Sequence, residues 1–386
     1  MTPLLQAINK KMNTYVKSLA EDGEAFETKD LTGRFSLDGL ATSAFGVEAG
    51  SFNKEESEFL KHAKAVFRPT KWTFPQFILG MFTPNIVKKV ATTLGVGQIF
   101  TWPFANDHSN FLMHVVDESF KQRKESGTKR NDLLDLMIDA IDGNLEDLDD
   151  HDIHSSDQFE KDAKIVGHVK NKGLAYDDVV ATAMLLLAAG YDTTGTALSW
   201  ILYDLAMNPN CQDTLYEEIR DAGRDASKLS YESLQSLPYL DAVIHETLRR
   251  HTPIATLERC CSKDYHVPGT DIIIKKGQIV RASNAGICMD SNIFSNPYEY
   301  NPENFLKENS SDRNPYSFLT FSLGPRNCIG MRFSMFEMKV CITSLVSKFN
   351  FIPCEKTTAY ENLDYDPIDF FGRPKGGLWI KCEVRV

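Results

Sequence analysis

Apolar residues recur at intervals of three and four along the first half of the chain, which is the period of an amphipathic α-helix. This pattern predicts helices over residues 3–19, 36–46, 53–67 and 106–124, and a longer helix over 176–207. Two shorter helices follow at 211–223 and 239–251, and Pro253 stops the second one. The pattern then changes to short extended pieces at 270–280 and 378–384, with one late helix after Cys328. We therefore expect a mainly α fold with small β-sheets (α+β).

Two segments depart from this pattern. Residues 74–104 are rich in Phe, Ile, Leu and Met and are cut by three prolines, so they either touch a membrane surface or belong to the core, and the core is favoured. Residues 142–163 are acidic and have no usable period, which predicts a solvated loop. His151 and His154 in this loop could bind a metal, but a solvated loop does not supply the preorganised shell that metal sites need.

The net charge of −11 has one source. Between Asp132 and Asp162 the chain has twelve acidic residues against Lys161 alone, so the remainder is neutral. We interpret this stretch as an acidic loop on a protein whose other positive and negative charges balance. Because binding to a phosphate backbone needs clustered Lys and Arg, we expect no nucleic-acid partner.

Hydropathy and cysteine content give further information on the class of protein and its compartment. The longest apolar run, residues 179–191, is shorter than the roughly 20 residues that cross a bilayer, and the N-terminus lacks the apolar core of a signal peptide. The eight cysteines show neither a CxxC pair nor a metal-binding spacing, so we expect free thiols in a reducing compartment. With 386 residues and 42% hydrophobic composition, the chain can bury one large core or two ordinary ones.

The stretch FSLGPRNCIG places Cys328 just before the late helix. A thiol at a helix N-terminus is stabilised as its anion, so we expect a lowered pKa for Cys328. A thiolate is either a nucleophile, which needs a histidine base that is not nearby in sequence, or a metal ligand, and a haem would supply the other iron ligands. Gly324 and Gly330 would let the backbone approach a flat face, Phe321 could pack on it, and Arg326 could pair with a propionate. A buried structural cysteine is the remaining alternative.

A second feature is AAGYDTTGTALSW within the long predicted helix. Asp192 and Thr193 interrupt an apolar run, and buried polar groups are usually either satisfied or functional. The alternative is a Thr193 hydroxyl bonded back to its own helix. One helical face combines small residues with a single leucine, so a bulky group can lie against it; these residues are Thr182, Leu186, Ala189, Thr193 and Ala197.

The third feature is HETLRR, in which Glu246 and Arg249 are three residues apart on one predicted helix. Such pairs are common and carry weight here only together with the other two features. No glycine-rich phosphate loop follows a strand, so electrons for any redox chemistry must come from another protein.

These three features, in this order, resemble the cytochrome P450 haem-thiolate monooxygenases. FSLGPRNCIG fits the family's Phe-x-x-Gly-x-Arg-x-Cys-x-Gly signature, AGYDTT fits its oxygen-activating helix and ETLR fits its Glu-x-x-Arg pair. The resemblance covers essentially the whole chain as a single domain, residues 1–386, and is strongest over 176–386. The family begins with a membrane anchor and a propionate-binding helix, so this chain looks N-terminally truncated. Asn304 stands where the family usually has Arg, which puts the network with Glu246 and Arg249 in question.

The resemblance implies roles for individual residues. Cys328 would be the axial thiolate ligand of haem b, Arg326 and Arg259 would bind propionates, and Thr193 and Asp192 would serve oxygen activation and proton relay. Substrate would lie between the 182–189 face, the turn 253–257 and the Phe370-Phe371 pair. The remaining cofactor-binding positions are Phe321, Gly324, Gly330, Ala189 and Gly190, and Glu246, Arg249 and Asn304 would be structural.

The resemblance also implies an activity: insertion of one oxygen atom from O2 into a lipophilic small molecule such as a xenobiotic, steroid or fatty acid. Electrons would pass from NADPH through a flavoprotein reductase, with cytochrome b5 as a further partner, at the cytoplasmic face of the endoplasmic reticulum membrane. Arg326, Arg332 and Lys339 could form the surface on which a negatively charged partner docks. Two alternatives are a haem-thiolate isomerase or dehydratase that needs no O2, and a truncated fragment without activity.

Overall fold

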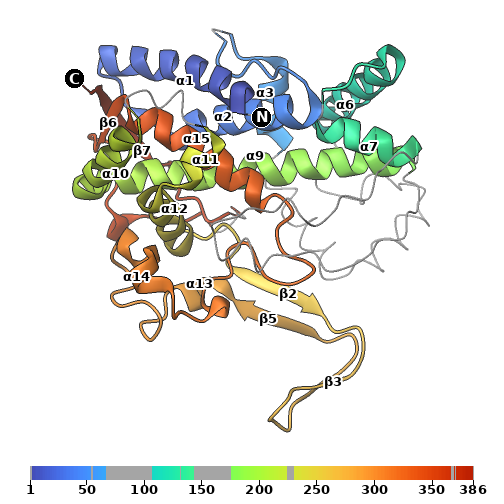
Figure 1. Cartoon of the computed structure of the whole chain (residues 1–386), viewed down its shortest axis with the longest axis vertical. Coiled ribbons are helices and arrows are strands. Elements are labelled where there is room, and N and C mark those ends of the chain that lie inside the picture. The colour runs from blue at the N-terminus through green and yellow to red at the C-terminus, as the bar shows by residue number, and fades with distance from the viewer. Residues whose placement is uncertain are drawn as a thin grey trace.

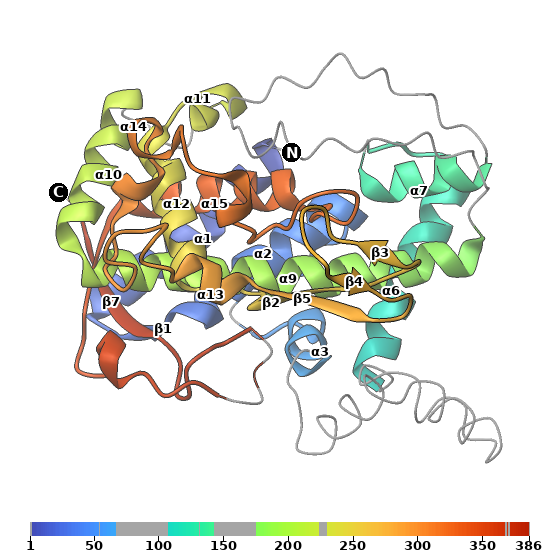
Figure 2. The same cartoon turned by 90° about the horizontal axis from the view of Figure 1, so that it is seen from below.

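The computed structural model of the protein describes residues 2–53, 55–66, 107–130, 132–142, 175–223, 230–366, 369 and 371–385. The apolar segment 74–104 and most of the acidic segment, with His151 and His154, lie outside these residues. Within the described part, helices dominate and the strands form small antiparallel sheets (Figures 1 and 2). The expected mainly α fold is thereby confirmed.

The helices that the periodicity predicts are present, and the longest one has the predicted bounds, 176–207. These helices are α1 (Thr2–Asp22), α2 (Thr28–Phe45), α3 (Glu58–Val66), α6 (Asp107–Ser126), α9 (Tyr176–Met207), α10 (Pro209–Ala222), α12 (Pro238–Arg250) and α15 (Met331–Val346). Four short helices were not predicted: α7 (Leu133–Asp142), α11 (Tyr231–Gln235), α13 (Asn284–Cys288) and α14 (Lys307–Ser310). Single 3₁₀ turns lie at η3 (Pro302–Phe305), η4 (Pro315–Ser317) and η5 (Tyr360–Asn362).

Helix α7 shows that the acid-rich stretch counted from Asp132 begins as a helix, while the predicted solvated loop, 142–163, lies almost wholly outside the described residues. Asp132 and Asp135 are buried, and Nη1 of Arg123 donates to both carboxylates at 2.9 and 2.6 Å. The acids lie beside a buried guanidinium, so their charge is used within the fold rather than solvated. Charge counting along the sequence could not reveal this, because Arg123 belongs to the preceding helix α6.

The strands form three small antiparallel groups. Strand β7 (Trp379–Val384) lies between β1 (Phe26–Glu27) and β6 (Phe349–Ile352), so the N-terminal and C-terminal parts of the chain share one sheet. Strands β2 (Thr256–Cys260) and β5 (Ile279–Ser283) form a hairpin whose tip carries β3 (Tyr265–His266) and β4 (Ile273–Ile274). Figure 1 shows this hairpin projecting from the helical body.

Helix α2 packs along α9 at very short range. A Cβ added to Gly195 of α9 would lie 3.2 Å from the Cα atom of Gly33 in α2, so both backbones approach closely only because these residues are glycines. Thr32 Oγ1 donates to the Gly195 carbonyl at 2.7 Å across the same contact. This packing fixes the position of α9, which carries Asp192 and Thr193.

Carboxylate side chains hold the N-terminal ends of two helices that carry the predicted site, one from within its helix and one from a neighbouring helix. Asp178 accepts the backbone N–H of Ala175 at 3.1 Å and so caps the start of α9. Glu218 of α10 accepts the backbone N–H groups of Tyr239 and Leu240 at 2.7 and 2.8 Å, at the start of α12. These bonds satisfy donors that a helix cannot pair internally.

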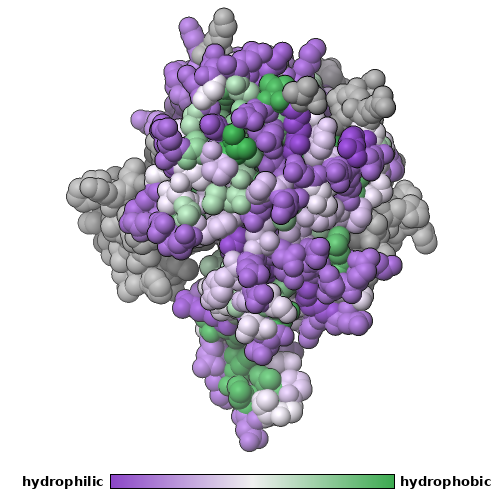
Figure 3. All heavy atoms as spheres, turned by 90° about the vertical axis from the view of Figure 1, so that its left-hand side faces the viewer, coloured by the Kyte–Doolittle hydropathy of each residue, from purple (hydrophilic) through white to green (hydrophobic). Residues whose placement is uncertain are grey.

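The main core lies between α1, α9, α12, α15 and the β1–β7–β6 sheet. The surface in Figure 3 is mostly hydrophilic, with apolar side chains gathered on the projecting hairpin, where Tyr265, Ile272 and Ile273 are exposed. In the described part of the chain, no helix combines the length and apolarity that a bilayer crossing requires.

Candidate functional site

Cys328 lies in an open loop two residues before Gly330, the N-cap of α15. The Cys328 backbone N–H donates to the Phe321 carbonyl at 2.8 Å, which closes the loop into a compact turn. Gly324 in this turn has φ +81°, a conformation that favours glycine, and a Cβ placed there would meet nothing within 4 Å. The Cys328 residue itself is exposed. The loop therefore presents a thiol beside open space.

The structure does not support the low pKa expected for this thiol. Desolvation by the surrounding protein atoms raises the pKa of Cys328 above its ordinary value, although the residue is exposed to solvent. The hydrogen bond from the Gly330 N–H opposes this shift only in part. The reason is geometric: Cys328 lies outside the first turn of α15 and meets one free N–H rather than several. Its conversion to a thiolate would need a further positive charge, such as a metal ion.

The two arginines predicted to bind propionates come together at this loop. Arg259, on β2, donates from Nη2 to Ser322 Oγ at 3.0 Å and to the carbonyl of Arg326 at 3.4 Å. Both arginines are exposed. Two guanidinium groups at the rim of one loop create a site that attracts carboxylates.

Asp192 is buried in α9 and is held by two cations from distant segments. Its Oδ1 atom lies 2.8 Å from Lys29 Nζ and 3.0 Å from Arg373 Nη1. Burial lowers the pKa of the Lys29 ammonium group, and the Asp192 carboxylate opposes this shift. The other carboxylate oxygen, Oδ2, is buried and has no hydrogen-bond partner among the described residues.

The residues next to Asp192 in α9 are arranged differently. Thr193 donates its hydroxyl to the Ala189 carbonyl at 2.5 Å, which is the back-bonded arrangement considered above as an alternative. Ala189 is exposed, whereas a Cβ on Gly190 would lie 2.9 Å from Leu40 of α2. The glycine at 190 is thus explained by packing against α2, while its role at a cofactor stays a prediction.

Glu246 and Arg249 form a fully buried, two-pronged ion pair within α12. The guanidinium donates from Nε and Nη2 to the two carboxylate oxygens at 2.7 and 2.8 Å, and from Nη1 to the Cys288 carbonyl at 2.7 Å. Asn304 joins this pair, since its amide lies 3.4 Å from both oxygens of Glu246. An asparagine therefore completes the network with long contacts to the same carboxylate.

With this geometry in view, sequence comparison identifies the family: a family model described as Cytochrome P450 matches residues 1–377. The chain belongs to the cytochrome P450 family.

The chain is 31% identical over 359 residues to cytochrome P450 6k1 of Blattella germanica, covering 92% of this chain and 66% of that protein. It is also 29% identical over 389 residues to probable cytochrome P450 6a18 of Drosophila melanogaster and 31% identical over 387 residues to cytochrome P450 3A12 of Canis lupus familiaris. These alignments cover 100% of this chain and 71% and 70% of the two relatives. The chain thus spans about two thirds of the length of these relatives.

The residues present fit the haem that a P450 fold implies. The donor set combines the exposed thiol and exposed Arg326 of one loop with exposed Arg259, which reaches this loop from β2, and Gly324 leaves the space beside the loop free of a side chain. Phe333, in the first turn of α15, packs against the residue cluster that contains Leu187 of α9. Contacts between α15 and α9 bring the helix that follows Cys328 and the predicted oxygen-activating helix into one region of the P450 fold.

The prediction that Lys339 lies on the docking surface is wrong. Lys339 of α15 is 1% exposed, and its ammonium lies 2.7 Å from Asp241 and donates to Gln235 at 2.6 Å. A buried, paired lysine cannot receive a docking partner. Arg326 and Arg332 remain exposed, so the docking prediction is restricted to these two.

The sequence missed several charged residues around the site. Lys29, Arg373 and Arg313 lie outside the motifs, and no local pattern marks them. Arg313 lies over the Phe294 ring at 4.5 Å and donates to the Asn304 carbonyl at 2.6 Å, so a second guanidinium lies beside the Glu246 network. Phe371 is half-buried, and Phe370 lies outside the described residues.

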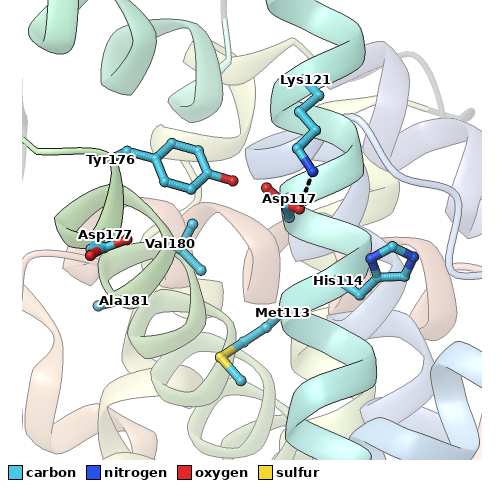
Figure 4. A pocket seen from close by; sticks show the side chains of 8 residues that line it. All are labelled: Met113, His114, Asp117, Lys121, Tyr176, Asp177, Val180 and Ala181. Carbon is cyan, nitrogen blue, oxygen red and sulfur yellow. Dashed lines mark hydrogen bonds and ion pairs between the residues drawn. The ribbon is translucent and has the colours of Figure 1, made fainter.

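A pocket of about 500 Å³ lies elsewhere, between α6 and the first turns of α9 (Figure 4). Its lining includes Met113, Asp117, Tyr176 and Val180, with an Asp117–Lys121 ion pair of 2.7 Å on one side. Val180 precedes Gly190 by ten residues, about 15 Å along the helix axis. This pocket contains none of the residues predicted for the haem site.

Proposed function

We propose that this P450 chain is a haem-thiolate monooxygenase, with Cys328 as the axial ligand of haem b. The observation that carries the proposal is the exposed Cys328 thiol in an open loop whose rim carries Arg259 and Arg326. When bound, a thiolate-ligated haem supplies the activation of O2. The protein residues would hold it: Cys328 at the iron, and Arg259 and Arg326 at the propionates.

Asp192 and Thr193 are proposed to handle protons. The free Oδ2 atom of Asp192 can accept a proton while Oδ1 stays with Lys29 and Arg373. Thr193 donates to the Ala189 carbonyl, and its oxygen keeps lone pairs that can accept a hydrogen bond from a group on the exposed side of Ala189. Together they could pass a proton from the buried interior to the open face of α9.

The substrate is proposed to be a lipophilic small molecule of the xenobiotic, steroid or fatty-acid type, bound near the 182–189 face of α9. Electrons would pass from NADPH through a flavoprotein reductase, with cytochrome b5 as a second donor, and docking would use Arg326 and Arg332. We place the protein at the cytoplasmic face of the endoplasmic reticulum membrane. These assignments are supported by family membership.

A second candidate is a haem-thiolate isomerase or dehydratase. Such an enzyme needs no proton delivery to O2, and in this structure the Thr193 hydroxyl donates to its own helix while Oδ1 of Asp192 is held by two cations. Consumption of O2 during turnover separates the two candidates.

The deciding experiment is an absorption spectrum of the purified chain with added haem, reduced, with and without carbon monoxide, beside Cys328→Ser. A strongly red-shifted Soret band that Cys328→Ser abolishes supports the proposal. A matched control is Cys354→Ser, which changes a half-buried thiol just after β6 that contacts Thr357 and should leave the band unchanged. Absence of haem uptake, or a band typical of histidine ligation, would overturn the assignment and would favour a fragment without activity.

A further inference from the structure

Two histidines from different helices meet on the surface formed by α3 and α6, which pack against each other, with their rings tilted by 59°. His62 Nδ1 and His108 Nδ1 are 3.0 Å apart. His62 is stacked on Phe111, with ring centroids 4.1 Å apart and an interplanar angle of 12°, which restricts the rotation of its ring. Neither histidine belongs to the haem site described above.

The second nitrogen of His62 faces a carboxylate. Its Nε2 atom lies 3.8 Å from Glu58 Oε2, one helical turn earlier in α3. A neutral imidazole has one N–H and one lone pair, and the nearby carboxylate favours the N–H on Nε2. The lone pair of His62 then lies on Nδ1, directed toward His108. A carboxylate behind an imidazole whose other nitrogen carries the lone pair is the arrangement that orients histidine ligands in metal sites.

The spacing of the two Nδ1 atoms also suits one ion. With nitrogen–metal bonds of about 2.0–2.1 Å, two nitrogens 3.0 Å apart subtend an angle of roughly 90° at the ion. That angle is compatible with two ligands on the same side of a distorted tetrahedral or octahedral ion. Imidazole nitrogens prefer Zn²⁺, Cu²⁺ and Ni²⁺ to the harder Mg²⁺ and Ca²⁺.

We propose that His62 and His108 bind a divalent transition-metal ion, such as Zn²⁺, through their Nδ1 atoms, with water completing the ligand set. Without the ion, His108 donates its Nδ1 proton to His62. With the ion, the His108 proton moves to its own Nε2, so both lone pairs face the metal and the count of protons is unchanged. The ion links α3 to α6 and restricts their separation, and this role goes beyond the proposed oxygenase function.

Another group on α6 provides an internal comparison. His114, Asp117 and Glu118 have ligand atoms within 4.8 Å of one another. Lys121 lies 2.7 Å from Asp117 and 3.6 Å from Glu118, much as Lys61 lies 2.7 Å from Glu58, but this group offers one imidazole where the other offers two. We therefore expect His114 to contribute nothing to the tight site, and His114→Ala serves as a matched control on the same helix.

The test is equilibrium dialysis against ZnCl2, together with the change in melting temperature that Zn²⁺ produces. The wild type is compared with His62→Ala, His108→Ala and His114→Ala. We expect at least a tenfold loss of affinity for the tight site in the first two variants, and no change in the third. Glu58→Gln should weaken binding by about tenfold, because the carboxylate only orients His62.

Each variant is also melted without Zn²⁺, so that any loss of stability from the substitution is separated from the metal-dependent shift. Weak binding by the free cysteines is common to all variants and cancels in the comparison. If His62→Ala and His108→Ala bind Zn²⁺ as tightly as the wild type, or if His114→Ala removes the tight site, the proposal is overturned and the pair is only hydrogen-bonded. Haem binding does not enter this measurement, so its outcome is independent of the proposed function.

Discussion

Asp192 Oδ1 lies 3.0 Å from Nη1 of Arg373, although 181 residues separate the two along the chain. The same oxygen is 2.8 Å from Lys29 Nζ, so one carboxylate joins α2, α9 and the C-terminal segment. Because this carboxylate is buried, removal of either cation leaves its negative charge less compensated. The contact thus connects the predicted proton relay to the overall stability of the fold.

We predict that replacing the two cations that hold Asp192, Lys29 and Arg373, destabilises the protein to different extents. Lys29→Met should lower the free energy of unfolding by about 3 kcal/mol, since it removes the more buried cation, while Arg373→Gln should cost about 1–2 kcal/mol. Adding Asp192→Asn to Lys29→Met should restore part of the loss, because no buried charge is then left unpaired. Urea unfolding of the single and double variants measures this coupling; strictly additive losses would contradict it.

The buried pair in α12 leads to a second prediction. Arg249→Lys should destabilise the protein by about 3–5 kcal/mol, because one ammonium cannot replace the guanidinium bonds to Glu246 and to the Cys288 carbonyl. Lys61→Ala breaks the exposed pair with Glu58 and should leave the denaturant midpoint unchanged. A similar midpoint for Arg249→Lys and the wild type would show that the α12 network is dispensable.

A third prediction concerns pH. Burial raises the pKa of Glu337 well above its ordinary value of 4.5, with a small opposing effect from Ser36. The folded state therefore keeps a proton that the unfolded state releases above pH 4.5, so this group makes the protein less stable as pH rises from about 5 toward 8. Glu337→Gln should flatten that decline and raise stability at pH 8. Urea titrations at pH 5, 6, 7 and 8 test the sign, and a steeper decline in the variant would refute it.

Thr193 offers a prediction on turnover, provided that the chain binds haem. Thr193→Ala removes the hydroxyl next to the exposed face of α9, so electrons should be diverted to hydrogen peroxide and the ratio of product to NADPH consumed should fall. Thr193→Ser keeps a hydroxyl and is the matched control. Undiminished coupling in Thr193→Ala would favour the isomerase or dehydratase candidate.

Because Lys339 is buried and Arg332 is exposed, we predict that the first affects stability and the second affects docking of the reductase. Lys339→Glu places a second negative charge beside Asp241 and should lower stability at every salt concentration. Arg332→Glu, on the exposed side of the same helix, should leave stability unchanged and slow reduction by the reductase at low salt. Equal reduction rates for the wild type and Arg332→Glu would remove this residue from the docking surface.

Local sequence patterns predicted what depends on neighbours in sequence. The bounds of α9, the loop around Cys328 and the Glu246–Arg249 pair follow from periodicity, glycine placement and i, i+3 spacing. The clamp on Asp192 could not be predicted, because Lys29 and Arg373 reach it only through tertiary packing. The same reason explains Lys339: the apolar pattern of α15 leaves it on an apparently polar face, but α11 and α12 supply Gln235 and Asp241 to cover it.

The complete burial of the Glu246–Arg249 pair separates it from the surrounding electrolyte. Mobile ions screen charges that solvent reaches, over about 10 Å at 0.1 M salt, but they cannot enter a pair with no exposed surface. Added salt will therefore weaken the attraction of a negatively charged partner to Arg326 and Arg332, while the Glu246–Arg249 ion pair in α12 is unaffected. Ionic strength is thus a means of releasing a docked partner from this protein without loosening the scaffold that shapes the Cys328 loop.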